Sequence, residues 1–235
     1  MKDFFEPFLY PHNLTLLGLV AAYICYRKKG LLVLLLFYYL SGNNFIANQF
    51  RSLYVGQTVS HAIAPGSAVV LLGCGGTDDK LTACASARIQ HLAELLPAEG
   101  ASVLMTSKHC KPYLNKLKSL IEHKQVAVDC IDGGENTYQE FNSLAARTEL
   151  KPDYIVTSDF HAWRVNQLVK QHNMHSKVLS TSSQTFRELN CNGNCMFTVN
   201  LSNFDFYSKL ISEFSSFAVY SLTYSWTDWY IPDTE

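Results

Sequence analysis

Apolar residues follow two different patterns along the chain, one before and one after about residue 50. Residues 8–50 form two nearly continuous apolar runs, separated by the basic triplet Arg27-Lys28-Lys29. From residue 66 onward, short apolar runs alternate with segments in which apolar residues recur every three or four positions. The short runs are typical of buried strands and the periodic segments of amphipathic helices. The pattern therefore predicts an apolar N-terminal part followed by an α/β domain.

The alternating part predicts strands over residues 66–73, 101–105, 126–131, 152–156 and 177–181, with a sixth over 195–199. Helices are expected over 81–96, 112–123, 138–150 and 162–172, and a long aromatic helix over 203–230. Alternating strands and helices are typical of βαβ units. We therefore expect a Rossmann-like, mostly parallel sheet with helices on both of its faces.

The two N-terminal apolar runs, 8–26 and 30–50, each reach the length of roughly 17 to 20 residues that just spans a bilayer core. The basic triplet between them favours the cytoplasmic side. We therefore expect a transmembrane hairpin over 1–52, a connector over 53–65, and a domain over 66–235 outside the cytoplasm. The alternative is a soluble helical pair, because Asn43 and Asn44 interrupt the second run. A cleaved signal peptide does not fit, since acidic and aromatic residues precede the first run.

The charge of the chain limits its expected binding partners, and its cysteine content bears on the compartment in which it folds. The chain has 19 basic and 20 acidic residues, so nucleic acid is not an expected partner. Of its seven cysteines, one lies in the first apolar run and the others are Cys74, Cys84, Cys110, Cys130, Cys191 and Cys195. A domain outside the cytoplasm could oxidise these six, but spacing alone does not fix their pairing. Cys191 and Cys195 are the best local candidates for a disulfide, and their zinc-binding alternative is weak because no second close pair accompanies them.

Polar segments follow four of the predicted strands, at 73–79, 106–108, 132–137 and 157–161. Open parallel sheets bind ligands beyond the carboxyl ends of their strands, so we expect these segments to share one pocket. Gly75 and Gly76 would let the backbone approach a ligand closely. The glycine turn is neither a dinucleotide fingerprint nor a P-loop. A backbone cradle for an anion and a plain tight turn both remain open.

Two acidic segments near the expected pocket have structural alternatives. Asp78 and Asp79 could bind a divalent cation, but a solvated acidic turn is the favoured interpretation. Thr137 and Glu140 have the spacing of a capping box at a helix N-terminus. Asn136 has no such structural need and could hold a substrate or a neighbouring turn.

Residues 153–164, DYIVTSDFHAWR, are the strongest candidates for chemistry. We expect a turn and helix N-cap at 157–159, followed by a helix that carries His161 and Arg164 on one face. His161 is the predicted acid or base. Arg88 and Arg164 would clamp a phosphate. The alternative is an ordinary strand–helix junction with a structural histidine and a surface arginine.

The full set of expected ligand-binding residues is Gly75, Gly76, Arg88, Ser107, Asn136, Thr137, Ser158 and Arg164. Asn136 and Ser158 are the orienting groups in this set. No metal ligand is predicted, and the sequence does not name a cofactor.

These motifs together resemble the ElyC/SanA/YdcF family of bacterial envelope proteins. The resemblance rests on the glycine-ended strand 69–76, on Arg88, on ENTYQE at 135–140 and on VTSDFHAWR at 156–164. The two apolar runs, and Glu213 in the last helix, are similar to the ElyC branch in particular. The chain departs from the family pattern after its second strand, where 106–108 reads Thr-Ser-Lys in place of Ser-Gly-Gly. It also has Phe141 where the family commonly has a second Asn.

The resemblance implies a protein anchored by two spans in the bacterial inner membrane, with its α/β domain in the periplasm. It implies a role in cell envelope or peptidoglycan biogenesis and a phosphorylated ligand linked to the polyprenyl-phosphate carrier. If the protein is an enzyme, hydrolysis or transfer at a phosphate would be its reaction. The alternatives are a non-enzymatic scaffold for envelope synthesis proteins and, by likeness to a cytoplasmic relative, a domain that binds a nucleotide or S-adenosylmethionine.

Overall fold

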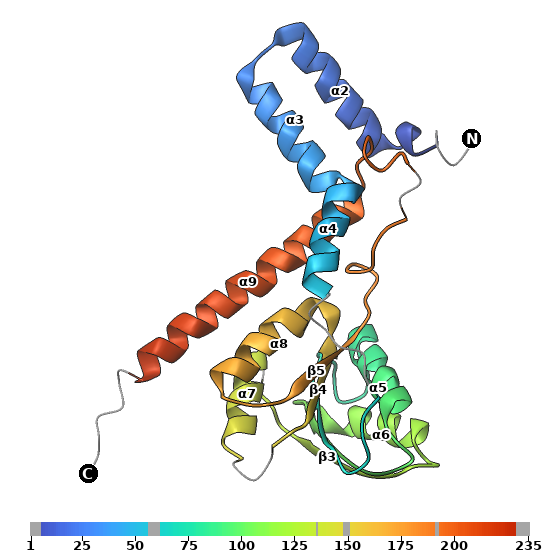
Figure 1. Ribbon diagram of the computed structural model, residues 1–235, viewed down its shortest axis with the longest axis vertical. Coiled ribbons are helices and arrows are strands. Elements are labelled where there is room, and N and C mark those ends of the chain that lie inside the picture. The colour runs from blue at the N-terminus through green and yellow to red at the C-terminus, as the bar shows by residue number, and fades with distance from the viewer. Residues whose placement is uncertain (1–5, 56–61, 135, 148–150, 191–192, 229–235) are drawn as a thin grey trace. The chain divides into compact units, whose positions relative to one another are not determined.

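The computed structural model describes residues 6–55, 62–134, 136–147, 151–190 and 193–228 (Figure 1). The chain divides into two compact units. The helical unit comprises residues 1–56 and 184–214, and the α/β unit comprises residues 57–183 and 215–235. The predicted boundary near residue 66 is therefore incomplete, because a later segment of the chain belongs with the N-terminal helices.

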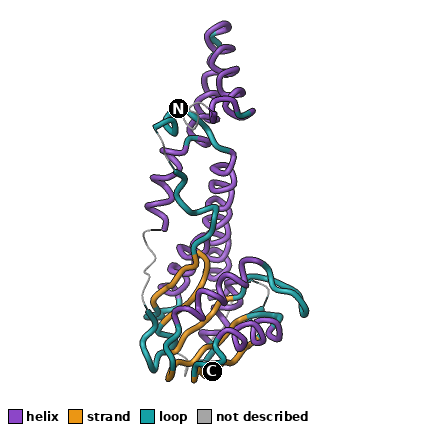
Figure 2. Tube along the Cα trace, turned by 90° about the vertical axis from the view of Figure 1, so that its right-hand side faces the viewer, coloured by secondary structure: helices purple, strands orange, loops and turns teal. Residues whose placement is uncertain are grey.

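The α/β unit contains a five-stranded, all-parallel sheet, as the alternating pattern predicted (Figure 2). Its strands are β1 (Ala68–Leu72), β2 (Glu99–Thr106), β3 (Gln125–Ile131), β4 (Tyr154–Ser158) and β5 (Lys177–Thr181). They lie in the order β3-β2-β1-β4-β5. The sixth strand predicted over 195–199 is not formed, and Val199 makes an isolated antiparallel bridge with Asn43 instead.

Both faces of the sheet are covered by helices. Val69 and Leu71 of β1 pack in one core with α5 (Ala83–Leu95) and α6 (Cys110–Leu120). Val70 and Leu72 pack in a second core with α7 (Thr137–Ala145) and α8 (Asp159–Gln171). Because alternate residues of a strand point to opposite faces, a strand covered on both sides must be apolar throughout. This is why β1 reads as an unbroken apolar run.

The last helix, α9 (Leu201–Asp228), confirms the long aromatic helix predicted at the C-terminus. Its part within the α/β unit packs on the face formed by α7 and α8. The ring centroids of Phe217 and Trp163 lie 5.3 Å apart, and those of Tyr220 and Tyr138 lie 5.5 Å apart. Aromatic pairs at these distances are favourable beyond the area they bury.

The turn predicted at 157–159 is not formed. β4 ends at Ser158 and α8 begins at Asp159, so the strand leads directly into the helix. Asp159 is 2% exposed, and its carboxylate accepts the backbone N–H groups of Phe160 and Ser183 at 2.7 Å each. This buried carboxylate satisfies backbone donors that a solvated turn would leave to water.

The helical unit contains η1 (Glu6–Leu9), α2 (Pro11–Tyr26), α3 (Lys29–Gly42) and α4 (Asn44–Val55). The second apolar run is thus broken into α3 and α4 at Asn43. The Asn43 side chain donates to the carbonyls of Cys195 and Met196 and accepts the backbone N–H of Ile46 at 3.1 Å. The residue that interrupts the apolar run is therefore the one that ends α3 and holds the 195–199 segment.

The described helices of the hairpin are shorter than the two expected spans. α2 has 16 residues and α3 has 14, which at 1.5 Å per residue is about 24 and 21 Å. Among the described residues, none of the helices combines the length and apolar character needed to cross a membrane. Many of their large apolar side chains are exposed: Leu14, Leu17, Ile24, Val33, Leu34, Leu36, Phe37 and Leu40.

Candidate functional site

A polar pocket of about 290 Å³ lies beyond the carboxyl ends of β1, β2 and β3. Each strand contributes the loop that follows it, so three of the four predicted polar segments form one shared site, and the segment 157–161 does not line it. The lining residues are Gly73, Gly75, Gly76, Ser107, Lys108, His109, Gly134, Asn136, Thr137 and Glu140. The pocket therefore combines glycine backbone, a lysine, a histidine, an amide and a carboxyl group.

Two helices begin at the pocket. α6 starts at Cys110, directly after the lining residues Lys108 and His109. α7 starts at Thr137, and the Asn136 side chain caps it by accepting the backbone N–H of Gln139 at 3.0 Å. The first turn of a helix carries unsatisfied N–H groups and a partial positive charge. Together with the Lys108 ammonium group, these termini favour an anion in the pocket.

The capping box predicted for Thr137 and Glu140 is wrong. Asn136 is the capping residue, and the Glu140 side chain binds the ends of β1 and β2 instead. One oxygen of Glu140 accepts the backbone N–H of Gly73 at 2.9 Å and the hydroxyl of Thr106 at 2.8 Å. A carboxylate that joins two strand ends from the first turn of a helix cannot be inferred from helical spacing alone.

Glycine makes room for the Glu140 side chain. A Cβ atom at Gly73 would lie 2.6 Å from the Thr106 carbonyl oxygen and 3.2 Å from a Glu140 oxygen. A Cβ atom at Gly133 would lie 2.8 Å from Glu140 Cγ. Real Cβ atoms essentially never approach other atoms within 3.0 Å, so Gly73 and Gly133 are needed for packing beside Thr106 and Glu140.

Burial raises the pKa of the Glu140 carboxyl above its ordinary value of 4.5. The hydrogen bonds from Thr106 and Gly73 and the charges of Arg88 and Arg164 oppose that rise. Desolvation is the largest of these effects, because removing a carboxylate from water disfavours its charged form. The lining of the pocket therefore contains a carboxyl group that holds its proton more strongly than a surface glutamate.

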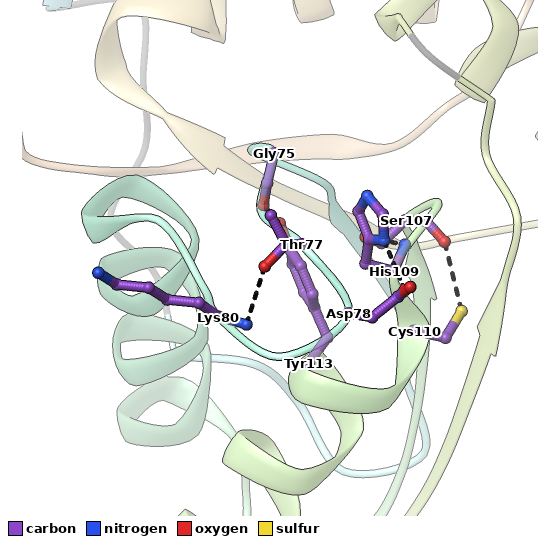
Figure 3. A network of polar contacts seen from close by, with 8 residues as sticks. All are labelled: Gly75, Thr77, Asp78, Lys80, Ser107, His109, Cys110 and Tyr113. Atoms are coloured by element: carbon purple, nitrogen blue, oxygen red, sulfur yellow. Dashed lines mark hydrogen bonds and ion pairs between the residues drawn. The ribbon is translucent and has the colours of Figure 1, made fainter.

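A hydrogen-bond network on the buried Tyr113 joins the loops after β1 and β2 (Figure 3). The Tyr113 hydroxyl donates to the Gly75 carbonyl at 2.9 Å and accepts the backbone N–H of Cys74 at 2.8 Å. Ser107 also bonds to this hydroxyl. Burial raises the pKa of Tyr113, which keeps the phenol neutral and able to donate. The glycine turn is thus held in place by a residue of α6.

The same network orients His109. Its backbone N–H donates to Ser107 Oγ at 3.1 Å, and its ring Nδ1 lies 2.8 Å from Asp78 Oδ1 (Figure 3). Asp78 is 87% exposed and the His109 side chain is 26% exposed. A carboxylate can only accept, so Nδ1 carries the proton in this bond. Nε2 is then the ring nitrogen through which His109 can exchange a proton with a molecule in the pocket.

Arg88 does not line the pocket. It is 1% exposed and bridges β1 and β4. Its Nη1 donates to the carbonyls of Leu72 and Gly73 at 2.9 and 2.6 Å, and its Nε donates to Ser158 Oγ at 2.8 Å. The gap between β1 and β4 is where the strand order reverses, which is the usual ligand crevice of such sheets. In this protein Arg88 joins β1 to β4 at that point, and the pocket described above lies over β1, β2 and β3.

His161 and Arg164 also lie outside the pocket lining. Arg164 Nη2 lies 2.8 Å from His161 Nδ1, and its guanidinium carbon is 5.6 Å from the ring centroid of Tyr220. Arginine can only donate, so Nδ1 of His161 accepts and the ring is neutral in this bond. The pair packs against α9 through Tyr220, and Arg164 is 6% exposed, so it is not the surface arginine of the alternative interpretation.

Of the predicted site residues, the structure brings together Gly75, Gly76, Ser107, Asn136 and Thr137. It places Arg88, Ser158, His161 and Arg164 elsewhere in the α/β unit. Gly73, Lys108 and Gly134 lie within the predicted polar segments but were not singled out as ligand-binding residues, and His109 and Glu140 lie outside those segments. Lys108 and His109 follow Ser107 directly, so the signal for them was their position after a strand end.

Disulfides fix the borders of the pocket. Cys74 pairs with Cys84, which holds the loop after β1 to the start of α5. Cys110 pairs with Cys130, which holds the start of α6 to the end of β3. Cys195 is also disulfide-bonded, whereas Cys191 lies outside the described residues. The α/β unit is thus an oxidised domain whose pocket loops are covalently tied to neighbouring elements.

No protein-family model matches the chain, and a search of curated proteins finds no significant relative. Within the described ranges there is also no group of three histidine, cysteine or acidic residues arranged to hold a metal ion. The chemistry of the site must therefore be argued from its own residues.

Proposed function

We propose that this protein is a membrane-associated factor of bacterial cell envelope biogenesis whose α/β unit binds a phosphorylated, lipid-linked precursor. The pocket over β1, β2 and β3 is the binding site. The observation that carries the proposal is the meeting of Lys108, His109 and two helix N-termini in one small polar pocket.

A phosphate group matches the chemistry of this pocket. Lys108 supplies a positive charge, and the N-termini of α6 and α7 supply oriented backbone dipoles. Glu140, which would repel an anion when charged, is buried and its pKa is raised. In its protonated form it can donate a hydrogen bond to a phosphate oxygen.

The oxidised cysteines support a location outside the cytoplasm. Disulfides persist in oxidising compartments and are rare where glutathione and thioredoxin keep thiols reduced. The α/β unit carries the bonds Cys74–Cys84 and Cys110–Cys130. The basic triplet 27–29 between α2 and α3 supports the same orientation, because basic turns stay on the cytoplasmic side. Both features fit a periplasmic α/β unit.

The apolar hairpin supports an association with the bilayer. Exposed leucine, valine, isoleucine and phenylalanine side chains are costly in water and favourable in lipid, at about 25 cal/mol per Å² of apolar surface. α2 and α3 present such side chains along their length. We propose that this hairpin inserts into the inner membrane with its basic turn toward the cytoplasm. The resemblance to the ElyC branch supports the link to envelope biogenesis.

Binding can be tested with the full-length chain in lipid nanodiscs. Isothermal titration with inorganic phosphate and with a polyprenyl monophosphate should show saturable binding. Lys108→Gln should weaken affinity about tenfold, because it removes one charge-assisted hydrogen bond. Asn136→Asp should weaken it further, since aspartate caps a helix as well as asparagine but adds a negative charge to the pocket.

Lys116→Gln is the matched control. Lys116 is an exposed lysine of α6 that does not line the pocket, so its loss should leave affinity unchanged. Equal weakening by Lys108→Gln and Lys116→Gln would mean that the chain attracts phosphate only through general charge. Absence of binding in the unchanged protein would refute the proposal.

A further inference from the structure

The geometry points to a catalytic pocket: we propose that His109, held by Asp78, is the general base and Glu140 the general acid of a phosphoester hydrolase. This inference rests on the binding function proposed above and assigns a reaction to the same pocket. The residues differ from the pair that the sequence pattern suggested, because His161 and Arg164 are engaged with one another.

His109 has the arrangement of a proton-transfer group. Its ring lines the pocket, its backbone is fixed by Ser107, and its Nδ1–H is directed to Asp78 Oδ1 at 2.8 Å. A carboxylate that binds one ring nitrogen fixes the tautomer and leaves a lone pair on the other. An imidazole held in this way can take a proton from a water molecule that shares the pocket with a phosphate group.

Ser107 is not the nucleophile. Its hydroxyl accepts the His109 backbone N–H and bonds to the Tyr113 hydroxyl, and the residue is 7% exposed. The hydroxyl group of Ser107 is therefore engaged in hydrogen bonds to His109 and Tyr113 that position the loop. Water is left as the attacking group, which makes the reaction a direct hydrolysis.

Glu140 is suited to protonate the leaving oxygen. It lines the same pocket, and one of its oxygens is fixed by Gly73 and Thr106. The second oxygen can then carry the proton. Burial favours the protonated form of this carboxyl group. The pocket thus holds a carboxyl group that favours its protonated form and an imidazole ring, which together can supply an acid and a base.

The reaction converts a phosphomonoester and water into an alcohol and inorganic phosphate. The water oxygen forms a bond to phosphorus while one water proton passes to His109 Nε2. The bond from phosphorus to the ester oxygen breaks, its electron pair stays on that oxygen, and the oxygen takes the proton of Glu140. Proton exchange through solvent then returns the proton from His109 to Glu140, so no other reactant is needed.

Phosphate release by the full-length chain in nanodiscs tests the inference, with glycerol phosphate, 4-nitrophenyl phosphate and a polyprenyl monophosphate as probes. His109→Gln should lower kcat by about 10²- to 10⁴-fold for all three. Glu140→Gln should lower kcat strongly for glycerol phosphate and little for 4-nitrophenyl phosphate, because nitrophenolate leaves without a proton. His123→Gln alters an exposed histidine after α6 and should change nothing.

Asp78 is a positioning residue, and its role has a separate readout. Asp78→Asn keeps a hydrogen-bond acceptor but removes the charge, so kcat should fall about tenfold, the effect of losing one modest interaction. The acid limb of the pH–rate profile should also move to lower pH, which a purely structural role would not cause. Asp79→Asn removes the neighbouring carboxylate and should leave both quantities unchanged.

The outcomes separate this inference from the binding function. Phosphate binding without release from any of the three probes would overturn the catalytic assignment and leave the binding function standing. Loss of both would overturn both. Wild-type rates in His109→Gln would overturn the assignment of the base. Phosphate affinity and the urea unfolding midpoint, measured for every variant, show whether a loss of rate reflects loss of the fold.

Discussion

Both units of the chain contain many leucine, valine and aromatic residues but place them differently. In the α/β unit, residues such as Leu71 and Ile155 are 0% exposed, each in the core on one side of the sheet. In the helical unit, residues such as Val33 and Phe37 are 66% and 64% exposed. The α/β unit buries such side chains in cores of its own. The helical unit leaves many of the apolar side chains of α2 and α3 exposed.

Several polar residues are buried in the helical unit, beside apolar residues such as Tyr54 and Phe206. Among these polar residues, Asn13 and Asn43 are 2% and 1% exposed. Asn13 exchanges hydrogen bonds with both backbone groups of Val199. Hydrogen-bonded asparagines thus lie inside this unit, while many apolar side chains of α2 and α3 are exposed. Hydrophobicity alone therefore does not tell which residues form the core.

The largest expected effect is on the free energy of unfolding, and it appears when a buried leucine is compared with an exposed one. Leu71→Ala in β1 should lower the free energy of unfolding by about 3 to 4 kcal/mol, because it leaves a cavity in a closed core. Leu36→Ala in α3, where the side chain is 47% exposed, should lower it by less than about 0.5 kcal/mol. Urea unfolding in detergent, followed by tryptophan fluorescence, measures both. Similar losses would show that the helical unit has a core of its own.

A charge on the hairpin should affect membrane association rather than folding. Val33→Lys replaces an exposed apolar residue of α3 with a residue that disfavours lipid, a change of about 3 kcal/mol and roughly 100-fold in partitioning. Vesicle flotation measures this partitioning. Ser119→Lys, which adds a charge to exposed α6, is the matched control. Unchanged flotation of Val33→Lys would contradict insertion of the hairpin.

Loss of a disulfide should destabilise the α/β unit selectively. Replacing both Cys110 and Cys130 by serine opens a loop with a sequence separation of 20 residues, which should cost about 3 kcal/mol of unfolding free energy. Cys25→Ser, at the exposed free cysteine of α2, should cost nothing measurable. Denaturant midpoints with and without reductant provide the measurement. Equal midpoints would mean that the pocket loops are held by packing alone.

The smallest expected effect concerns the charge of Glu140. Its folded-state pKa is raised above 4.5, so the folded protein binds this proton more strongly than the unfolded chain does. The resulting stability is fully present below that value and is lost as pH rises through the raised pKa. Glu140→Gln should remove this component and make stability less dependent on pH in that window. Unfolding curves between pH 4 and pH 8 would show a steeper decline for the wild type, and parallel curves would contradict the prediction.

The sheet could be predicted because its strands are buried on both faces. The apolar run over 66–73 stands out in any hydrophobicity pattern, and the polar loops that follow such strands must meet at one edge. This reasoning brought Gly75, Ser107 and Asn136 to one pocket. The break in the second apolar run was harder to predict. The side chain of Asn43, which follows the end of α3, bonds to residues about 150 positions later in the chain.

The roles of individual charged residues could not be predicted in the same way. Arg88 looked like a phosphate clamp, but its Nη1 donates to the carbonyls of Leu72 and Gly73 and its Nε donates to Ser158. The hydrogen bond between Asp78 and His109 joins residues that are 31 positions apart in the sequence. Both lie in loops, and the conformation of a loop cannot be predicted from hydrophobic periodicity. Hydrophobic patterns locate strand ends, whereas the direction of a polar side chain depends on contacts that form only in the folded chain.

The two disulfides of the α/β unit join cysteines that are consecutive in the sequence, Cys74 with Cys84 and Cys110 with Cys130. A chain that is synthesised from its N-terminus would therefore complete each pair before the next pair appears. Each bond closes between neighbouring strand and helix elements, so neither has to wait for distant parts of the chain. Correct pairing of these four cysteines can thus follow the order in which they are synthesised.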